Sequence, residues 1–240
     1  MKQNQIDRVW RWQITASAAA ALLIACLLGV GFGPVNLDFG SIIRTLLGLP
    51  NGLENEDRTL LLELRLPRVV LGALVGAALA TSGAVYQSVF RNPLADPYLL
   101  GVASGAGLGA TIAITNGGGD LHALLPIFAF LGGVLAVGAT FLVAGRLFAD
   151  PSTLLLAGIA VGSFATAFQT YLQQRNSAAL RPVYSWILGE LTVANWDVVK
   201  WAGFYILIAL AVLIRISKVL DALMLSDEEA YSLGVSPQKI

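Results

Sequence analysis

Long stretches without a charged residue alternate along the chain with short polar segments. A helix needs about 20 apolar residues to cross the hydrocarbon core of a bilayer, and five stretches of roughly that length or more lack Asp, Glu, Lys and Arg. A sixth carries Lys200 near its start and is followed by Arg215 and Lys218, whose long side chains can reach the lipid headgroups. The pattern predicts six membrane-spanning helices, at about residues 14–36, 69–90, 98–116, 123–145, 153–174 and 198–219.

The composition agrees with this pattern. Of the 240 residues, 56% are hydrophobic and only 12% are charged, whereas about a quarter of the residues of a soluble domain are charged. The sequence therefore predicts an all-α membrane protein. Its first apolar stretch follows Lys2, Arg8 and Arg11 as a signal peptide would, but an apolar core of about 20 residues is long for a signal peptide. We expect a retained anchor there.

The charges bear on orientation and on partners. Lys and Arg favour the cytoplasmic side of a membrane, so Lys2, Arg8 and Arg11 predict a cytoplasmic N-terminus. Alternation of the spans then places eight of the 15 Lys and Arg residues inside and seven outside, which is a weak bias. The net charge is zero, which argues against a nucleic-acid partner. The single cysteine, Cys26, can form no intrachain disulfide, and we expect no metal site or directly bound cofactor.

Small residues recur at helical spacing within the predicted spans. Helices in lipid associate through close backbone contact at small residues. The candidates for such contacts are Gly72, Gly76, Gly101, Gly105, Gly109, Gly158 and Gly162. Some of these glycines could instead line a pathway, because their bare backbone can face a substrate.

The polar residues inside the spans are neutral. No Asp, Glu or Lys lies in the middle of a span, and carriers driven by protons or ions usually need such a residue, which argues against a secondary transporter. No Gly-Lys dipeptide is present to form a phosphate-binding loop. The chain is therefore not expected to be an enzyme. If it moves a solute uphill, a separate subunit must hydrolyse the nucleotide.

Two segments on the predicted cytoplasmic side carry candidate contacts. Pro151 begins a helix after Asp150, so Ser152 and Thr153 lie either at a simple turn or at the exit of a central path. In the tail, Ser226 and Glu229 form a capping-box pattern and Gly234 can end the short helix. Its apolar side, with Ala230 and Leu233, is suited to docking on a partner. The alternative is a solvated helical loop.

Two arginines, Arg65 and Arg68, precede the second span. Pro67 is a natural first residue for a helix, which would put Arg68 in a first turn where the helix dipole disfavours a cation. The topology also places both arginines on the outer side, against the usual charge bias. Ordinary contact with lipid phosphate is one interpretation. The second, which we favour, is docking of an acidic surface on a soluble partner.

Several motifs in order resemble a known family. They are Arg65-Leu-Pro-Arg68, Gly76-Ala-Ala-Leu-Ala-Thr-Ser-Gly83, Asn92-Pro-Leu-Ala-Asp-Pro97, Leu100-Gly-Val-Ala-Ser-Gly105, Leu155-Leu-Ala-Gly158, Trp186-Ile-Leu-Gly189 and Ser232-Leu-Gly-Val235. Together they resemble the FecCD-type permeases, the membrane subunits of type II ABC importers for ferric siderophores, haem and cobalamin.

The resemblance implies a permease of ten helices in a bacterial inner membrane. It implies a second permease subunit, a pair of cytoplasmic ABC ATPases and a periplasmic or lipoprotein binding protein as partners. Arg65 and Arg68 would face the binding protein, Ser152 and Thr153 the cytoplasmic gate, and residues 226–234 the ATPase. The polar side chains expected along the translocation path are Ser82, Gln87, Gln169 and Thr170.

The cargo implied is a metal chelate, with a ferric siderophore first and cobalamin or haem as alternatives. The sequence stops at Ile240, where the resemblance would place four more spans, so we expect a C-terminally truncated permease. A truncated membrane protein that does not transport is the alternative from another class.

Overall fold

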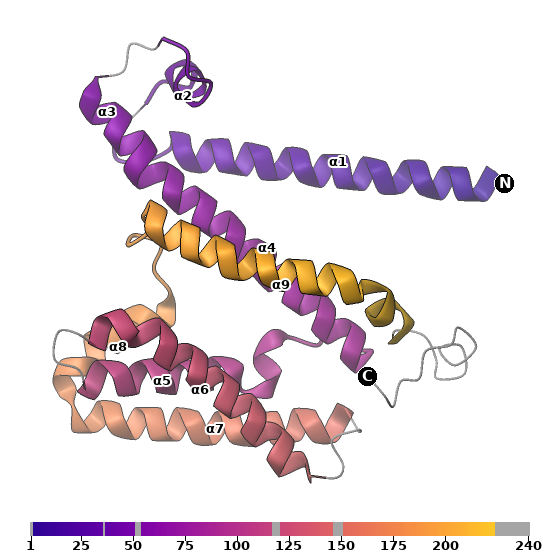
Figure 1. The fold of residues 1–240 in the computed structure, drawn as a ribbon, viewed down its shortest axis with the longest axis vertical. Coiled ribbons are helices and arrows are strands. Elements are labelled where there is room, and N and C mark those ends of the chain that lie inside the picture. The colour runs from indigo at the N-terminus through magenta and orange to yellow at the C-terminus, as the bar shows by residue number, and fades with distance from the viewer. Residues whose placement is uncertain (1, 36, 51–53, 117–120, 146–150, 224–240) are drawn as a thin grey trace. The chain divides into compact units, whose positions relative to one another are not determined.

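The computed structural model of the chain describes residues 2–35, 37–50, 54–116, 121–145 and 151–223. All regular structure within these ranges is helical (Figure 1). The chain divides into two compact units, each of which is described by itself. The first unit comprises Met1–Ala78 and Leu191–Ala209, and the second comprises Leu79–Glu190 and Leu210–Ile240.

The first unit gathers the N-terminal helices. It contains α1 (Lys2–Gly31), α2 (Phe39–Leu46), α3 (Asn55–Thr59), η1 (Leu60–Arg65) and the starts of α4 (Leu66–Phe90) and α9 (Trp196–Leu223). The Asp38 carboxylate caps α2 by accepting a hydrogen bond from the Ser41 backbone N–H at 3.0 Å. Val30, Leu37, Ile42 and Leu61 form a buried cluster that joins α1, α2 and η1.

A π-helical turn connects α3 to α4. Pro67 has no N–H, and its ring crowds the carbonyl four residues earlier in a regular helix. In η1 the backbone widens instead, so the Leu66 N–H donates to the carbonyl oxygen of Leu61, five residues earlier. Such π-turns allow a helix to continue past a misfit. As a result, one helical segment runs from Asn55 to Phe90.

This continuity corrects the prediction that Pro67 is the first residue of the helix that forms the second span. Arg68 lies inside a long helical segment and not in a first turn. The argument that the helix dipole disfavours a cation at Arg68 therefore does not apply, because that effect is confined to the terminal turns.

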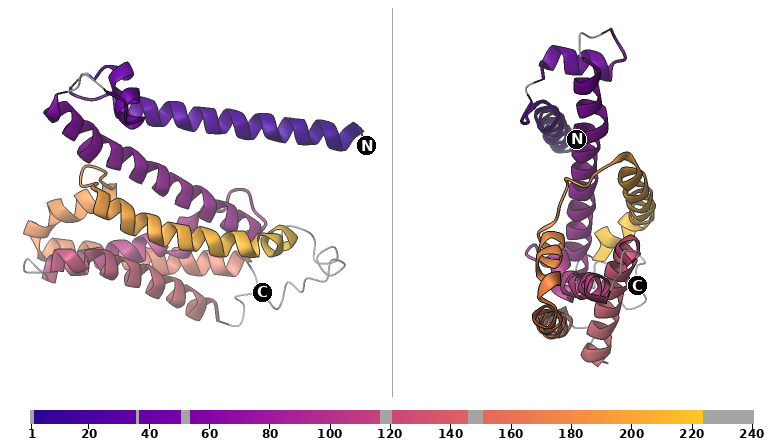
Figure 2. Two further views of the ribbon diagram at one scale, coloured as in Figure 1. Left: turned by 45° about the horizontal axis from the view of Figure 1, so that its top comes forward. Right: turned by 90° about the vertical axis from the view of Figure 1, so that its left-hand side faces the viewer.

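The second unit is a packed group of helices. It contains the end of α4, η2 (Pro97–Leu100), α5 (Val102–Asn116), α6 (Leu121–Ala144), α7 (Pro151–Arg175), η4 (Ser177–Ala179), α8 (Leu180–Leu188) and the end of α9. The central helix α5 packs against both α6 and α7 (Figures 1 and 2). A buried cluster of this unit consists of Phe90 at the end of α4, Leu100 in η2, and Ala95 in the segment between them.

Close approach of backbones explains several of the glycines. An added Cβ atom on Gly105, Gly109 or Gly158 would collide with the carbonyl oxygen of the chain packed against it. Gly162 and Gly101 also face each other, since a Cβ on Gly162 would lie 3.6 Å from the Cα of Gly101.

Gly72 and Gly76, two of the glycines of α4, have no such close backbone neighbour. A Cβ on Gly72 would make an ordinary 3.6 Å contact with Leu191, and one on Gly76 would meet no atom within 4 Å. The described residues therefore give Gly76 no neighbour that requires a glycine.

The predicted third span, residues 98–116, is interrupted. Gly101 has a φ of 77°, a left-handed conformation that ends the η2 turn, and α5 begins only at Val102 and has 15 residues. The Thr140 hydroxyl donates to the Leu100 carbonyl at this break, at 3.1 Å. With 15 residues, α5 is shorter than the roughly 20 that a span needs.

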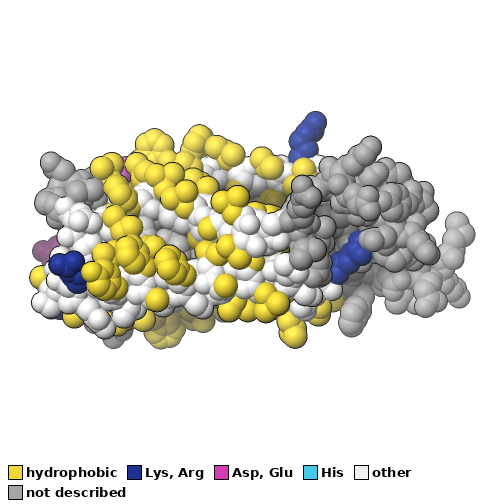
Figure 3. Space-filling view, turned by 90° about the horizontal axis from the view of Figure 1, so that it is seen from below, with side chains coloured by type: hydrophobic (Ala, Val, Ile, Leu, Met, Phe, Trp, Pro, Cys, Tyr) yellow, Lys and Arg dark blue, Asp and Glu magenta, His cyan; other side chains and the backbone are white. Residues whose placement is uncertain are grey.

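Five helices in the described ranges are long and apolar enough to cross a membrane. They are Trp12–Gly31, Asn55–Phe90, Leu124–Ala144, Ser152–Arg175 and Trp196–Asp221. The predicted count of six is therefore not confirmed. Figure 3 shows that apolar side chains cover much of the described part of one face, with few charged side chains among them.

The close α5–α6 contact can be tested by adding a methyl group. Gly109→Ala should lower the free energy of unfolding by about 1–3 kcal/mol, because overpacking displaces a rigid backbone neighbour. The matched control is Gly138→Ala in α6, where a Cβ meets nothing within 4 Å, so the better helix propensity of Ala should leave stability equal or higher. Unfolding in mixed detergent micelles, followed by circular dichroism, measures both. Equal effects of the two substitutions would contradict the packing described.

Candidate functional site

A hollow with polar lining lies among α5, α7 and α8 in the second unit. Its volume is about 570 Å³. An adjoining hollow of about 540 Å³ shares Tyr98, Ser104, Thr166 and Thr170 with it. We call the two together the polar hollow. Its principal polar lining residues are Tyr98, Ser104, Thr166, Gln169, Thr170, Gln173, Tyr184 and Trp186.

Helical periodicity places the polar residues of α7 on one side. Thr166, Gln169, Thr170 and Gln173 follow the i, i+3, i+4, i+7 spacing of a single helix face, and all four line the hollow. The end of α7 is tied to α5, since the Asn176 side chain donates to the Thr115 carbonyl at 3.3 Å. The hydrogen bond fixes α7 against α5, and the polar face of α7 borders the hollow together with α5 and α8.

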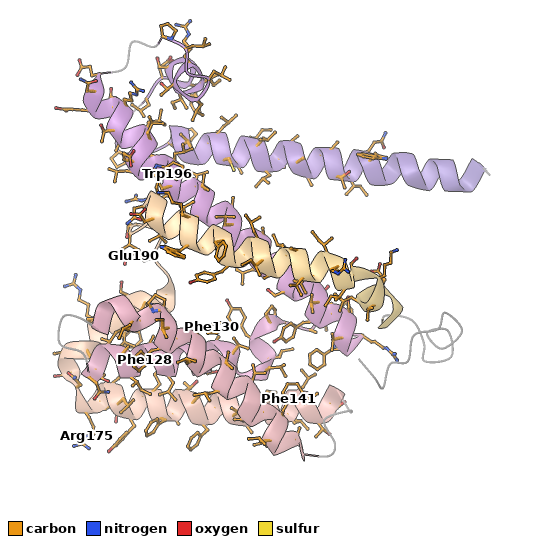
Figure 4. The ribbon with its side chains drawn as sticks, in the orientation of Figure 1. Phe128, Phe130, Phe141, Arg175, Glu190 and Trp196 are labelled. Atoms are coloured by element: carbon orange, nitrogen blue, oxygen red, sulfur yellow. The ribbon has the colours of Figure 1, made fainter. Side chains whose placement is uncertain are left out.

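The electrostatic character of the polar hollow is neutral. Its lining includes amides, hydroxyls, phenols and an indole, but no Asp, Glu, Lys, Arg or His among the described residues. The nearest cation along α7 is Arg175, which Figure 4 shows at the helix end; its guanidinium lies 6.0 Å from the centre of the Tyr171 ring. Across the described ranges, no group of His, Cys, Asp and Glu is arranged to hold a metal ion. The lining is suited to hydrogen bonding and not to metal ligation.

A second hollow, of about 440 Å³, is almost wholly apolar. Val102, Phe130, Val134 and Val137 contribute to its lining on α5 and α6, and Figure 4 labels Phe130 on α6. Trp186 of α8 borders both this hollow and the polar one. One side of α5 thus borders an apolar hollow and the other borders the polar hollow.

The structure brings together some of the predicted path residues and not others. Gln169 and Thr170 line the polar hollow, whereas Ser82 and Gln87 lie on α4 and line neither hollow. Ser152 and Thr153 lie in the first turn of α7. The predicted coupling residues Ser226, Glu229, Ala230, Leu233 and Gly234 lie outside the described residues.

Six of the eight principal lining residues were not selected as path residues from the sequence: Tyr98, Ser104, Thr166, Gln173, Tyr184 and Trp186. Gln173 lies one turn beyond Gln169, and its helical spacing could have revealed it. Tyr184 and Trp186 lie on α8, in a segment that the hydrophobic pattern treats as a loop. A helix of 9 residues gives too short a periodic signal to separate it from the surrounding polar stretch.

Arg65 is buried inside the first unit. Only 7% of its surface is exposed. Its guanidinium donates hydrogen bonds to the carbonyl oxygens of Val30 and Gly31, both at 3.0 Å, and to that of Val35. These carbonyls belong to the last turn of α1 and the segment after it, where helical carbonyls have no partner within the helix and a cation is favoured by the helix dipole. Arg65 therefore caps α1.

Arg68 lies on the same helical segment and is half-buried. One of its terminal nitrogens donates to the Thr192 carbonyl at 3.2 Å, while its Nε is buried without a hydrogen-bond partner among the described residues. Nearby, the Trp196 indole donates to the Leu62 carbonyl at 2.9 Å (Figure 4). The helix around Arg65 and Arg68 is thus held to both α1 and the start of α9.

A comparison with protein families identifies the chain. The profile described as the FecCD transport family matches residues 21–240. The chain belongs to the FecCD transport family. The resemblance found in the sequence motifs is therefore confirmed.

Curated relatives of this FecCD-family chain are permease proteins. The cobalamin import system permease protein BtuC of Halobacterium salinarum is 39% identical over 72% of the chain and 47% of its own length. The Fe(3+)-citrate import system permease protein YfmE of Bacillus subtilis is 31% identical over 92% of the chain and 66% of its own length. The ferric enterobactin transport system permease protein FepG of Escherichia coli is 32% identical over 92% of the chain and 66% of its own length.

A solved structure of a metal-chelate type ABC transporter, in an inward-facing conformation, has the same fold. It matches with a TM-score of 0.79 and 27% sequence identity, over 95% of the FecCD-family chain and 69% of its own length. The chain spans about half to two thirds of the length of the curated relatives described above.

The capping role of Arg65 can be tested by substitution. Arg65→Met should lower the free energy of unfolding by about 1–3 kcal/mol, because it leaves carbonyls at the end of α1 without donors. Arg58→Met is the matched control, since Arg58 is an exposed cation on α3 of the same helical segment. Hydrogen exchange near Gly31 should accelerate only in the Arg65 variant. Identical exchange and stability in both variants would rule out the cap.

Proposed function

We propose that the chain is the permease component of an ATP-driven importer for metal chelates, with ferric siderophore complexes as the cargo. The observation that carries the proposal is the FecCD family match over residues 21–240. Relatives named as ferric enterobactin and Fe(3+)-citrate permeases support an iron chelate as cargo. The chain itself has no catalytic role in this proposal, and a partner subunit hydrolyses ATP.

The polar hollow supports a translocation path along α7. A path for a bulky polar solute needs hydrogen-bonding groups, and Gln169 and Thr170 provide such groups in the lining of the hollow. Ser82 and Gln87 of α4 do not line the hollow, and we propose that they line another part of the path. At the first turn of α7, Ser152 and Thr153 are proposed to line the cytoplasmic gate.

The proposed assembly has a partner at each end. A second permease subunit completes the path, and a pair of ABC ATPases binds the segment 226–234 on the cytoplasmic side of a bacterial inner membrane, where the N-terminus also lies. A periplasmic or lipoprotein binding protein docks at the opposite end. Because Arg65 is buried and donates hydrogen bonds to the end of α1, Arg68 is the better placed of the two arginines to meet an acidic surface.

Cobalamin is the second candidate cargo. The 39% identity to a cobalamin import permease supports it. Haem is a weaker alternative without a comparable observation. A membrane protein that does not transport is the alternative from another class, and a proton-driven carrier is a third. Uptake that requires ATP, and that persists when the proton gradient is abolished, distinguishes the proposal from both.

Association with the ATPase tests the proposal directly. The full chain should co-purify with an ABC ATPase of the same organism. Leu233→Asp with Gly234→Asp should reduce the yield of ATPase by about tenfold or more, because charge on an apolar docking face must be desolvated on binding. Gln238→Asp, beyond the predicted helix, is the matched control and should leave the yield unchanged. Absence of any association with the unaltered chain would refute the proposal.

Binding-protein docking makes a separate prediction for Arg68. Arg68→Glu should slow association with the binding protein by about tenfold at low salt, because electrostatic attraction mainly raises the association rate. The difference from the unaltered chain should shrink as salt is added. Surface plasmon resonance on the chain in lipid nanodiscs gives both quantities. An unchanged association rate and salt dependence would show that Arg68 does not take part in docking.

A further inference from the structure

Two glutamines stand apart from the other buried polar side chains. Arg65, Ser88, Thr111 and Thr140 are all more than nine-tenths buried, and each has a hydrogen-bond partner within the chain. Gln169 and Gln173 of α7 are only 7% and 6% exposed. Neither amide has a hydrogen-bond partner among the described residues. Burial of an unpaired amide is unfavourable, so these two groups call for a partner from elsewhere.

Both amides open onto the polar hollow. Each glutamine lines it. Among the described residues, the Nε of Arg68 is the only fully buried side-chain nitrogen or oxygen without a hydrogen-bond partner, so the amide atoms of the two glutamines are not fully buried. The amide tips of Gln169 and Gln173 are therefore reachable from the hollow. A ligand in the hollow can accept hydrogen bonds from their N–H groups and donate to their oxygens.

The Gln169 amide packs closely against α5, and two hydroxyls of α7 share the hollow with it. The Gln169 Oε1 lies so close to α5 that a Cβ on Gly107 would be only 2.9 Å from it. The hydroxyls of Thr166 and Thr170 donate to backbone carbonyls of α7, both at 2.9 Å, so towards the hollow they offer lone pairs as acceptors. Trp186 of α8 adds an aromatic surface to the same lining.

The charge of the hollow sets the class of ligand. A carboxylate or catecholate anion that enters must lose water, and no cation in the described lining compensates for this loss. Amides are also weak ligands for a metal ion compared with thiolate, imidazole or carboxylate. The lining thus fits the outer surface of a chelate whose own ligands already enclose and neutralise the metal.

We propose that Gln169 and Gln173 bind the uncharged, amide-rich or hydroxamate-rich surface of the cargo, and that the hollow favours uncharged chelates over anionic ones. This inference rests on the proposed function and narrows its substrate class. Two sources share this chemistry, an uncharged ferric trihydroxamate and cyanocobalamin with its peripheral carboxamides. Ferric citrate, an anionic chelate, represents the disfavoured class.

Fluorescence of Trp186 provides a local measurement of binding. The full chain in nanodiscs of zwitterionic lipid is titrated with each of the three chelates, and the quenching is corrected with the Trp186→Phe variant. The half-saturating concentration for at least one uncharged chelate should be about tenfold or more below that for ferric citrate. The reason is that the anion loses hydration that no cation in the described lining replaces. The trihydroxamate and cyanocobalamin titrations distinguish the two sources.

Substitution identifies the groups responsible. Gln169→Leu and Gln173→Leu should each raise the half-saturating concentration of the uncharged chelate about tenfold. Gln174→Leu is the matched control, because Gln174 is the next residue of α7 and is exposed. The control should change binding less than about twofold. Thermal unfolding of all three variants shows whether a lost signal reflects lost folding. If the leucine variants do not fold, Gln169→Asn and Gln173→Asn replace them, because they keep the amide but shorten its reach.

Three results would overturn the inference. One is equal binding of ferric citrate and the uncharged chelates, and another is an equal effect of the Gln174 control. The third is that the leucine variants still bind the chelate but no longer assemble with other permease subunits. This result would mean that the amides form hydrogen bonds with a neighbouring helix and not with the cargo. If the chain still associates with its ATPase in these cases, only this inference fails. Loss of ATPase association by the unaltered chain refutes the proposed function itself.

Discussion

The absence of water inside a bilayer governs this structure, because every backbone N–H and C=O there needs a partner from the protein. Helices satisfy the requirement along most of the described chain, and the informative places are those where a helix ends or breaks. At the end of α1 the Arg65 guanidinium supplies the missing donors. At the break between η2 and α5, the Thr140 hydroxyl donates to the carbonyl of the buried Leu100. At Pro67 the π-turn re-pairs the backbone five residues apart.

Close helix contact follows from the same constraint. Lipid chains are as apolar as leucine, so helices gain little from hiding apolar surface from water and rely on tight packing instead. Gly105 and Gly109 allow α5 to approach α6 closely, and Gly158 allows α7 to approach the η2 segment. With α5 fixed between two helices, its opposite sides border hollows of different character, one apolar and one polar. The position of the polar residues of α7 depends on this packing.

The sequence was sufficient to predict the long helices, because a charge-free apolar stretch of about 20 residues is typical of a membrane span and rare elsewhere. It failed where conformation depends on single residues. The left-handed Gly101 shortened the predicted third span, and the π-turn before Pro67 extended the second. Of the predicted site residues, Gln169 and Thr170, which the family resemblance implied, line the hollow. The burial of Arg65 was not predictable, because its partners lie 30 or more residues away along the chain.

A hollow without fixed charge has a consequence for the time that a solute spends in it. A transport route must bind its cargo well enough to admit it and weakly enough to let it go. Differences in affinity between related complexes arise mostly in the dissociation rate, and an ion pair would slow dissociation more than neutral hydrogen bonds do. In the path proposed above, two amides and a few hydroxyls therefore suit a binding site that the cargo occupies only briefly at each turnover.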